Sequence, residues 1–169
     1  YDDTATVFWA SGACMAIRKD VFFKAGKFDE DFFAHQEEID LCWRIFNMGL
    51  KVKAVGNSTV YHLGGGTLHS MRPRKTFYNF RNSLYALLKN APGKQVGLLI
   101  FLRLILDALA ALKFLFNLKP AHSAAILQAH FNFYSHLKPL LKKRKNLQKK
   151  EKYIHKMSVV MAYYLRISK

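Results

Sequence analysis

Three carboxylates stand within four residues at Glu37, Glu38 and Asp40, directly after an aromatic and acidic stretch at 28–33. Acidic side chains in the first turn of a helix interact favourably with the helix dipole, by about 0.3–1 kcal/mol each, so the cluster could be purely structural. A carboxylate held at a helix start beside a loop can instead accept a proton from a substrate. The residues of the cluster leave both interpretations open.

The residues after the cluster predict the helix that positions it. Apolar residues recur every three to four positions and a glycine ends the run: Ile39, Cys42, Ile45, Phe46 and Gly49. Asp40 and Arg44 have the spacing of an i,i+4 ion pair, so Asp40 is expected to be at least partly structural. The sequence thus predicts a helix over 36–48 that begins at the carboxylates.

The first ninety residues predict several further elements. An extended segment is expected at 6–17 and a short helix at 19–25, followed after the carboxylates by two β-rich runs at 51–55 and 58–62. A longer helix is expected at 75–90. Gly12 and Ala13 would let a ligand or another backbone approach the first segment closely. Three glycines in a row, including Gly64 and Gly65, predict a loop whose amides face a ligand.

Basic side chains gather at the front of the helix predicted for 75–90. They are Arg72, Arg74, Lys75 and Arg81. Beside a glycine loop and an acidic pocket, such a group suits a diphosphate leaving group. A solvated charged helix face explains the same residues equally well.

The formal net charge of +16 is divided unevenly along the chain. Residues 1–40 hold nine of the eleven acidic residues, whereas Asp107 and Glu151 are the only acids among residues 41–169. Such a basic segment suggests a polyanionic partner, either nucleic acid or an anionic membrane surface. Because the basic residues lie beside apolar helices and form no recognised nucleic-acid module, we expect the membrane surface and no nucleic acid.

A break at 91–93, with the sequence Ala-Pro-Gly, predicts a boundary between a domain at 1–90 and a helical region at 91–169. The apolar segment 95–118 contains three charged residues, Arg103, Asp107 and Lys113. Each costs about 2.5–3.5 kcal/mol at a bilayer centre, which offsets the gain from the apolar residues. We therefore expect this helix to lie in a membrane interface or against a partner. A weaker amphipathic run and a stretch with nine basic residues follow, at 122–137 and 138–156.

Five motifs, in this order, carry a resemblance to a known family. They lie at 8–14, 26–33, 37–44, 60–67 and 77–82, within a stretch of about residues 5–90 that is roughly half of the chain. Together they resemble the second half of a family-two inverting glycosyltransferase, with rhamnosyl- and galactofuranosyl-transferase-like members nearest in pattern. The resemblance implies an α/β fold: the C-terminal half of a nucleotide-diphospho-sugar transferase domain, followed by an α-helical membrane-associating appendage.

The resemblance also implies roles for individual residues. An acceptor hydroxyl would attack the anomeric carbon of a nucleotide-sugar with inversion, in a hexosyl-type transfer, and Glu38 falls at the position of the family's base. The family has Asp there, so Glu37 stays an alternative, and Asp40 would support the base. His62 falls at the position of a ligand to a divalent metal, Mn²⁺ or Mg²⁺, although a histidine at a strand end is by itself more often structural. The substrate-binding residues would be Trp9, Gly12, Ala13, Gly64, Gly65, Lys75 and Arg81.

The family's nucleotide-binding first half, with its Asp-x-Asp metal motif, is not found in this sequence. We therefore expect a fragment, inactive alone, of an enzyme that uses a nucleotide-sugar donor and a glycan or lipid-linked acceptor. Such an enzyme would build cell-envelope polysaccharide at the cytoplasmic face of the cell membrane. The alternative is a non-catalytic membrane-surface or scaffold module, in which the carboxylates are only a helix start.

Overall fold

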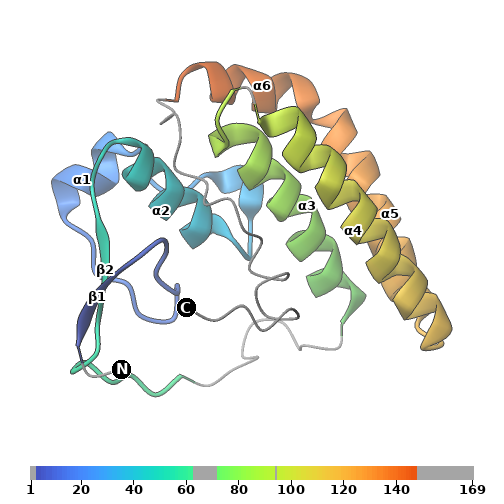
Figure 1. The fold of residues 1–169 in the computed structure, drawn as a ribbon, viewed down its shortest axis with the longest axis horizontal. Coiled ribbons are helices and arrows are strands. Elements are labelled where there is room, and N and C mark those ends of the chain that lie inside the picture. Colours follow the sequence, from blue (N-terminus) through green and yellow to red (C-terminus); the bar gives the residue numbers. More distant parts are fainter. Residues whose placement is uncertain (1–2, 63–71, 94, 148–169) are drawn as a thin grey trace.

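The computed structural model describes residues 3–62, 72–93 and 95–147. These residues are mostly helical, with one two-stranded sheet (Figure 1). The elements are β1 (Thr4–Val7), α1 (Lys19–Lys24), the 3-10 turn η1 (Glu30–Phe32), α2 (Glu37–Asn47), β2 (Val52–Val55), α3 (Pro73–Asn90), α4 (Val96–Phe116), α5 (Pro120–Ser135) and α6 (Leu137–Lys145).

The helices predicted from apolar spacing are confirmed as α1 to α5, with small differences at their ends. The strands predicted from the β-rich runs are confirmed only in part. β1 and β2 pair antiparallel, with Val7 opposite Val52, but β1 ends at Val7 and the β-rich run 58–62 is not a strand. The helix α6 lies in the basic stretch, where no helix was predicted.

Helix α3 has the central place among the helices. It packs against α2 on one side and against α4, α5 and α6 on the other, while the β1–β2 sheet lies beyond α2 (Figure 1). This arrangement lets α3 contact both the carboxylate-bearing helix and the three later helices. The α/β class of a whole transferase domain stays a prediction.

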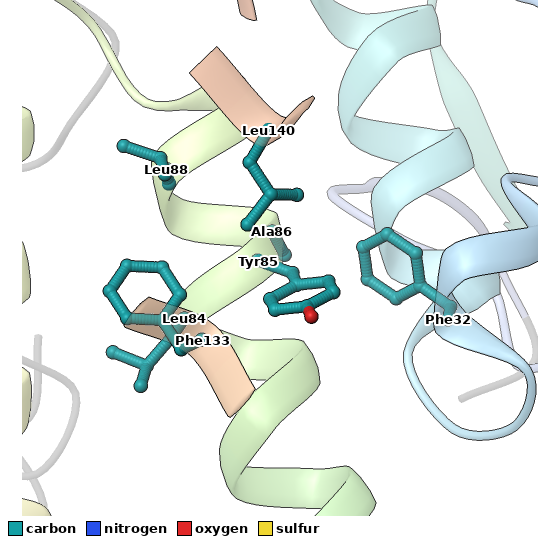
Figure 2. Packing of buried hydrophobic residues seen from close by; sticks show 7 residues of the cluster. All are labelled: Phe32, Leu84, Tyr85, Ala86, Leu88, Phe133 and Leu140. Atoms are coloured by element: carbon teal, nitrogen blue, oxygen red, sulfur yellow. The ribbon is translucent and has the colours of Figure 1, made fainter. Parts of the chain in front are cut away.

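The main apolar core surrounds Tyr85 of α3, and Figure 2 shows this ring between Phe32 and Phe133. The ring centroids of Phe32 and Tyr85 lie 6.1 Å apart in an edge-on arrangement. Burial raises the pKa of Tyr85 to about 12, and its hydroxyl donates to Asn132 Oδ1 at 2.9 Å. The core crosses the boundary predicted after residue 90, since Phe133 and Leu140 come from α5 and α6. The division into two domains stays a prediction.

Helix α4 turns most of its apolar side chains outwards. Leu98, Phe101, Leu102, Ile105, Leu106, Leu109, Leu112, Leu115 and Phe116 are all exposed. Asp107 instead faces α5 and is buried, with its carboxylate 2.6 Å from Arg103 Nε and 3.0 Å from His130 Nε2. Among the described residues, no helix is long and apolar enough to cross a membrane.

Candidate functional site

Glu37 and Glu38 are the first two residues of α2, and each has a buried carboxylate oxygen without a hydrogen-bond partner among the described residues. Burial raises the pKa of Glu38 above its ordinary value, and the charge of Glu37 raises it further. A carboxylate with one unpaired oxygen and a raised pKa is a stronger proton acceptor than an exposed one. Glu38 therefore has the properties that a general base requires.

Gly12 lies beside Glu38. A methyl group added at Gly12 would stand 3.9 Å from Cδ of Glu38, which is ordinary van der Waals contact. Gly12 and Ala13 are both exposed, and the backbone N–H of Ala13 donates to Ser11 Oγ at 3.2 Å. The structure thus brings two predicted parts of the site together, and the missing side chain leaves space beside the carboxylate.

The loop before α2 has an unusual backbone conformation. Three of its non-glycine residues have positive φ angles: Phe33 at 60°, His35 at 67° and Gln36 at 68°. Such angles cost about 1–3 kcal/mol each and persist only where surrounding structure imposes them. Here Asn82 of α3 imposes them, because its Nδ2 lies 3.0, 2.8 and 2.6 Å from the carbonyl oxygens of Phe32, Ala34 and His35.

Two more side chains, those of Gln36 and Arg81, hold this loop on α3. Gln36 donates from Nε2 to the carbonyl oxygen of Asn79 at 3.0 Å and to Ser83 Oγ at 2.8 Å. Arg81 donates from Nη2 to the carbonyl oxygens of Asp31 and Phe32, at 2.8 and 3.0 Å. We call the side chains of Gln36, Asn82 and Arg81 the loop clamp. Arg81 thus has a structural task, and its predicted contact with substrate stays a prediction.

Asp40 is fully buried and is held by three partners. Its carboxylate lies 2.8 Å from Arg44 Nη2, 2.9 Å from Lys89 Nζ and 2.8 Å from Asn90 Nδ2. The predicted i,i+4 pair with Arg44 is confirmed. Two cations pair with this carboxylate, so Asp40 fastens α2 to α3.

Lys89 extends this ion network to the acidic stretch before η1, because it also pairs with Asp29. Lys143 of α6 lies 2.6 Å from both Asp29 Oδ1 and Asp31 Oδ2. Burial works to raise the pKa of Asp29, but hydrogen bonds from Lys143 and Lys89 outweigh it and lower this pKa to about 2. The network connects α2, α3 and α6 with the loop that leads to the site.

Trp9 and Lys75 have different surroundings in the structure. Trp9 lines an apolar cavity of about 730 Å³ between the β1–β2 sheet and α1, together with Met15 and Cys42 but without Glu37 or Glu38. Lys75 lies near His35: burial lowers the pKa of His35 and the charge of Lys75 lowers it further. Lys75 forms no ion pair with any other described residue, so its charge stays available for a ligand.

The predicted metal site lacks support in the part of the chain that the structure describes. His62 is exposed, and the described residues contain no group of three or more potential ligands around one point. Gly64 and Gly65 lie outside the described residues. Since the described residues do not make a metal site, we derive no step of the reaction through a metal.

Sequence reasoning missed the loop clamp and both lysines of the ion network. One signal was available for the clamp: Asn79, Asn82 and Ser83 are polar at three- to four-residue spacing within a helix that also has an apolar face. Lys89 and Lys143 give no such signal, because a lysine that pairs internally looks the same in sequence as a solvated one.

Part of the chain is similar to known proteins. The chain is 36% identical over 56 residues to N-acetylglucosaminyl-diphospho-decaprenol L-rhamnosyltransferase from Mycobacterium tuberculosis, in strains CDC 1551 / Oshkosh and ATCC 25618 / H37Rv alike. The match covers 33% of this chain and 18% of each curated relative, so the chain spans less than a fifth of their length. No family model and no solved structure matches the chain. The matched part of the chain is similar to part of a glycosyltransferase.

Proposed function

We propose that this chain forms the acceptor side of an inverting glycosyltransferase, with Glu38 as the general base. The observation that carries the proposal is the Glu38 carboxylate itself, which is half-buried, has an unpaired oxygen and stands beside the open space at Gly12. The partial similarity to a rhamnosyltransferase supports the same reaction class.

In the proposed reaction the acceptor hydroxyl gives its proton to Glu38 while its oxygen forms a bond to the anomeric carbon of the donor sugar. The bond from that carbon to the diphosphate breaks on the opposite face, and the electron pair leaves with the nucleoside diphosphate, so the configuration inverts. The loop clamp and Asp40 hold Glu38 in place, because an angstrom of misplacement reduces such a step strongly. Glu37 is the alternative base and otherwise tunes Glu38 through its charge.

The proposed substrates are a nucleotide-sugar donor and a glycan or lipid-linked acceptor. The name of the relatives specifies transfer of L-rhamnose to an N-acetylglucosaminyl diphospho-lipid, so these two compound classes come first in any panel. Gly12, Ala13, Trp9 and Lys75 are the described residues proposed to contact substrate. The nucleotide would be bound largely by parts of the enzyme outside this chain.

A divalent metal on the diphosphate is a separate proposal, supported by the resemblance at His62 alone. Chelation with EDTA, followed by addition of Mn²⁺ or Mg²⁺, tests it in wild type and in His62→Ala. The proposal expects transfer to return with metal in the wild type and to need a higher metal concentration in the variant. Full transfer in EDTA would refute it.

The proposed function is tested by sugar transfer with the full-length protein that carries this chain, on a panel of nucleotide-sugars. Glu38→Gln removes the base but keeps the size of the side chain. Glu30→Gln is the matched control, since Glu30 is an exposed glutamate in the same acidic region. We expect transfer to fall by about 10²–10⁴-fold in Glu38→Gln and to be unchanged in the control.

A second candidate function, a membrane-surface module, is favoured by the outward apolar face of α4. Large exposed apolar faces mark interaction sites, and this face exposes leucine, isoleucine and phenylalanine side chains along α4. Within 95–147 Asp107 is the only acid, and it is buried in ion pairs, whereas eight basic residues are present. We propose an anionic lipid surface as the occupant, because it matches both the apolar side chains and the charge.

Vesicles with and without anionic lipid test this second candidate. Phe101→Glu with Leu109→Glu should abolish vesicle binding, because both side chains lie on the outward face of α4. Vesicle binding that survives loss of Glu37 and Glu38 fits either function, so only the transfer assay separates them. Normal transfer in Glu38→Gln would leave the membrane module as the better account.

A further inference from the structure

An exposed aromatic ring stands at the edge of the carboxylate site. Phe33, in the loop before α2, is 70% exposed. Its ring stacks on Tyr78 of α3, with the centroids 5.4 Å apart and the planes inclined by 28°. The guanidinium carbon of Arg74 lies 5.7 Å from both ring centroids. We call Phe33, Tyr78 and Arg74 the aromatic platform.

The fold gains little from placing Phe33 in this way. Its φ and ψ of 60° and −58° lie outside the regions that non-glycine residues favour. Such a conformation costs about 1–3 kcal/mol, and burial of a phenylalanine would return about 1.5–3 kcal/mol that this exposed ring mostly forgoes. The loop clamp holds the strained turn that presents the ring to solvent.

The platform and the proposed base are the two ends of one short segment, 33–38. Arg74 and Tyr78 are one helical turn apart on α3 and meet Phe33, while Asn79 and Ser83, further round the same helix, bind Gln36. Lys75 follows Arg74 in the chain, and its charge adds to burial in lowering the pKa of His35. His35 lies between the platform and Glu37 in the sequence. A ligand on the platform is therefore next to the start of α2.

The residues of the platform select a ligand with two parts. The face of an aromatic ring is electron-rich and attracts the C–H face of a sugar ring. A guanidinium binds phosphate oxygens in bidentate fashion, and Lys75 adds a second positive charge that no described carboxylate pairs with. A neutral sugar would leave both cations unused, whereas a sugar linked to a diphosphate uses the ring and the cations together.

We propose that the platform binds the acceptor as a sugar carrying a diphosphate, with the sugar on Phe33 and the phosphates at Arg74 and Lys75. That this ligand is the acceptor rests on the proposed function, because Glu38 takes its proton from the acceptor. The presence of a diphosphate-sugar site depends only on the platform. The two statements can therefore fail separately.

Direct binding tests the platform without any transfer. The probe is N-acetylglucosaminyl diphosphate with a short prenyl tail, and its comparison compound is the prenyl glycoside of the same sugar without phosphate. Calorimetry with the full-length protein should show tighter binding of the diphosphate. Phe33→Ala should lower the affinity for the probe by about tenfold, the size of one stacking contact. Phe33→Tyr should restore this affinity. Arg74→Gln should lower the affinity for the diphosphate probe but not the affinity for the comparison compound.

Phe23→Ala is the matched control. Phe23 on α1 is also exposed, at 52%, and also has a cation over its ring, with Lys27 Nζ 5.0 Å from the centroid. This variant should bind the probe as the wild type does. Absence of probe binding by the wild type would overturn the platform, as would equal binding by wild type and Phe33→Ala.

Transfer assays separate this outcome from the fate of the proposed function. Probe binding that depends on Phe33, without transfer from any donor, would uphold the platform and refute the transferase. If Glu38→Gln loses transfer but Phe33→Ala has an unchanged acceptor KM, the transferase proposal stands and the platform proposal is refuted. If both hold, Phe33→Ala raises the acceptor KM and leaves the donor KM unchanged.

Discussion

Asn82 of α3 holds the backbone of His35, whose carbonyl oxygen lies 2.6 Å from Asn82 Nδ2 although the residues are 47 positions apart in the chain. Through this contact a helix that carries no proposed catalytic residue sets the conformation of the loop that leads into Glu37 and Glu38. The proposed site is therefore built on α3 as much as on α2.

Replacing Asn82 by Ala should lower both stability and transfer. The change removes the Asn82 donor from the part-buried carbonyl oxygens of Ala34 and His35, whereas that of Phe32 keeps its contact with Arg81. Each carbonyl that water does not reach then costs about 1–3 kcal/mol. Urea unfolding should show a loss of about 2–3 kcal/mol. Asn146→Ala is the control, because Asn146 is exposed at the end of α6. Unchanged unfolding of Asn82→Ala would mean that the loop keeps its conformation without the clamp.

Lys89→Met should destabilise the protein strongly. Lys89 is 2% exposed and pairs with both Asp29 and Asp40. Among the described residues, its loss leaves the buried Asp40 with Arg44 as its only cation and the partly buried Asp29 with Lys143 alone. Removing one partner of a buried pair costs about 3–5 kcal/mol. The exposed Lys24→Met, on α1, should change the free energy of unfolding by less than about 0.5 kcal/mol. Similar values for both variants would show that the ion network adds little to stability.

The stability of the protein should fall in acid partly through Asp29. The pKa of Asp29 is lowered to about 2, against an ordinary 3.8 in the unfolded chain. The stabilisation from its ion pairs is thus complete above the unfolded pKa and is lost as pH falls towards 2. Unfolding free energies measured between pH 5 and about 2 should fall more steeply in wild type than in Asp29→Asn. Parallel curves would contradict the lowered pKa.

The charge of Glu37 should set the pH at which the base becomes active. Because burial and Glu37 both raise the pKa of Glu38, removing the charge in Glu37→Gln makes Glu38 easier to ionise. The acid limb of the profile of kcat/KM against pH should therefore move to lower pH in Glu37→Gln. A limb that moves to higher pH, or disappears, would favour Glu37 as the base.

Local patterns of the sequence were sufficient for α2 and its surroundings. Apolar spacing predicts the helix, Gly49 ends it with a φ of 86°, and the i,i+4 spacing predicts the pair of Asp40 with Arg44. These features depend on residues close together in the chain. The same holds for Gly26, whose φ of 85° follows α1 as predicted.

The parts that sequence reasoning missed depend on contacts between distant residues. Asn82 reaches a loop almost fifty residues earlier, and Lys143 reaches Asp29 across 114 positions. Asp107 stands out in the sequence as one of three charged residues of an apolar helix, and the structure turns it inwards to His130. No spacing rule within one helix indicates which partner on another helix a charged residue meets.

The most direct test of Glu38 as the base is a comparison of wild type, Glu38→Gln and Glu30→Gln in the full-length protein, with transfer and donor binding measured side by side. The structure leads us to expect that Glu38→Gln loses transfer, keeps donor affinity and unfolds at an equal or higher temperature, because a buried charge that costs stability is gone. Transfer at the wild-type rate in Glu38→Gln would contradict its role as the base.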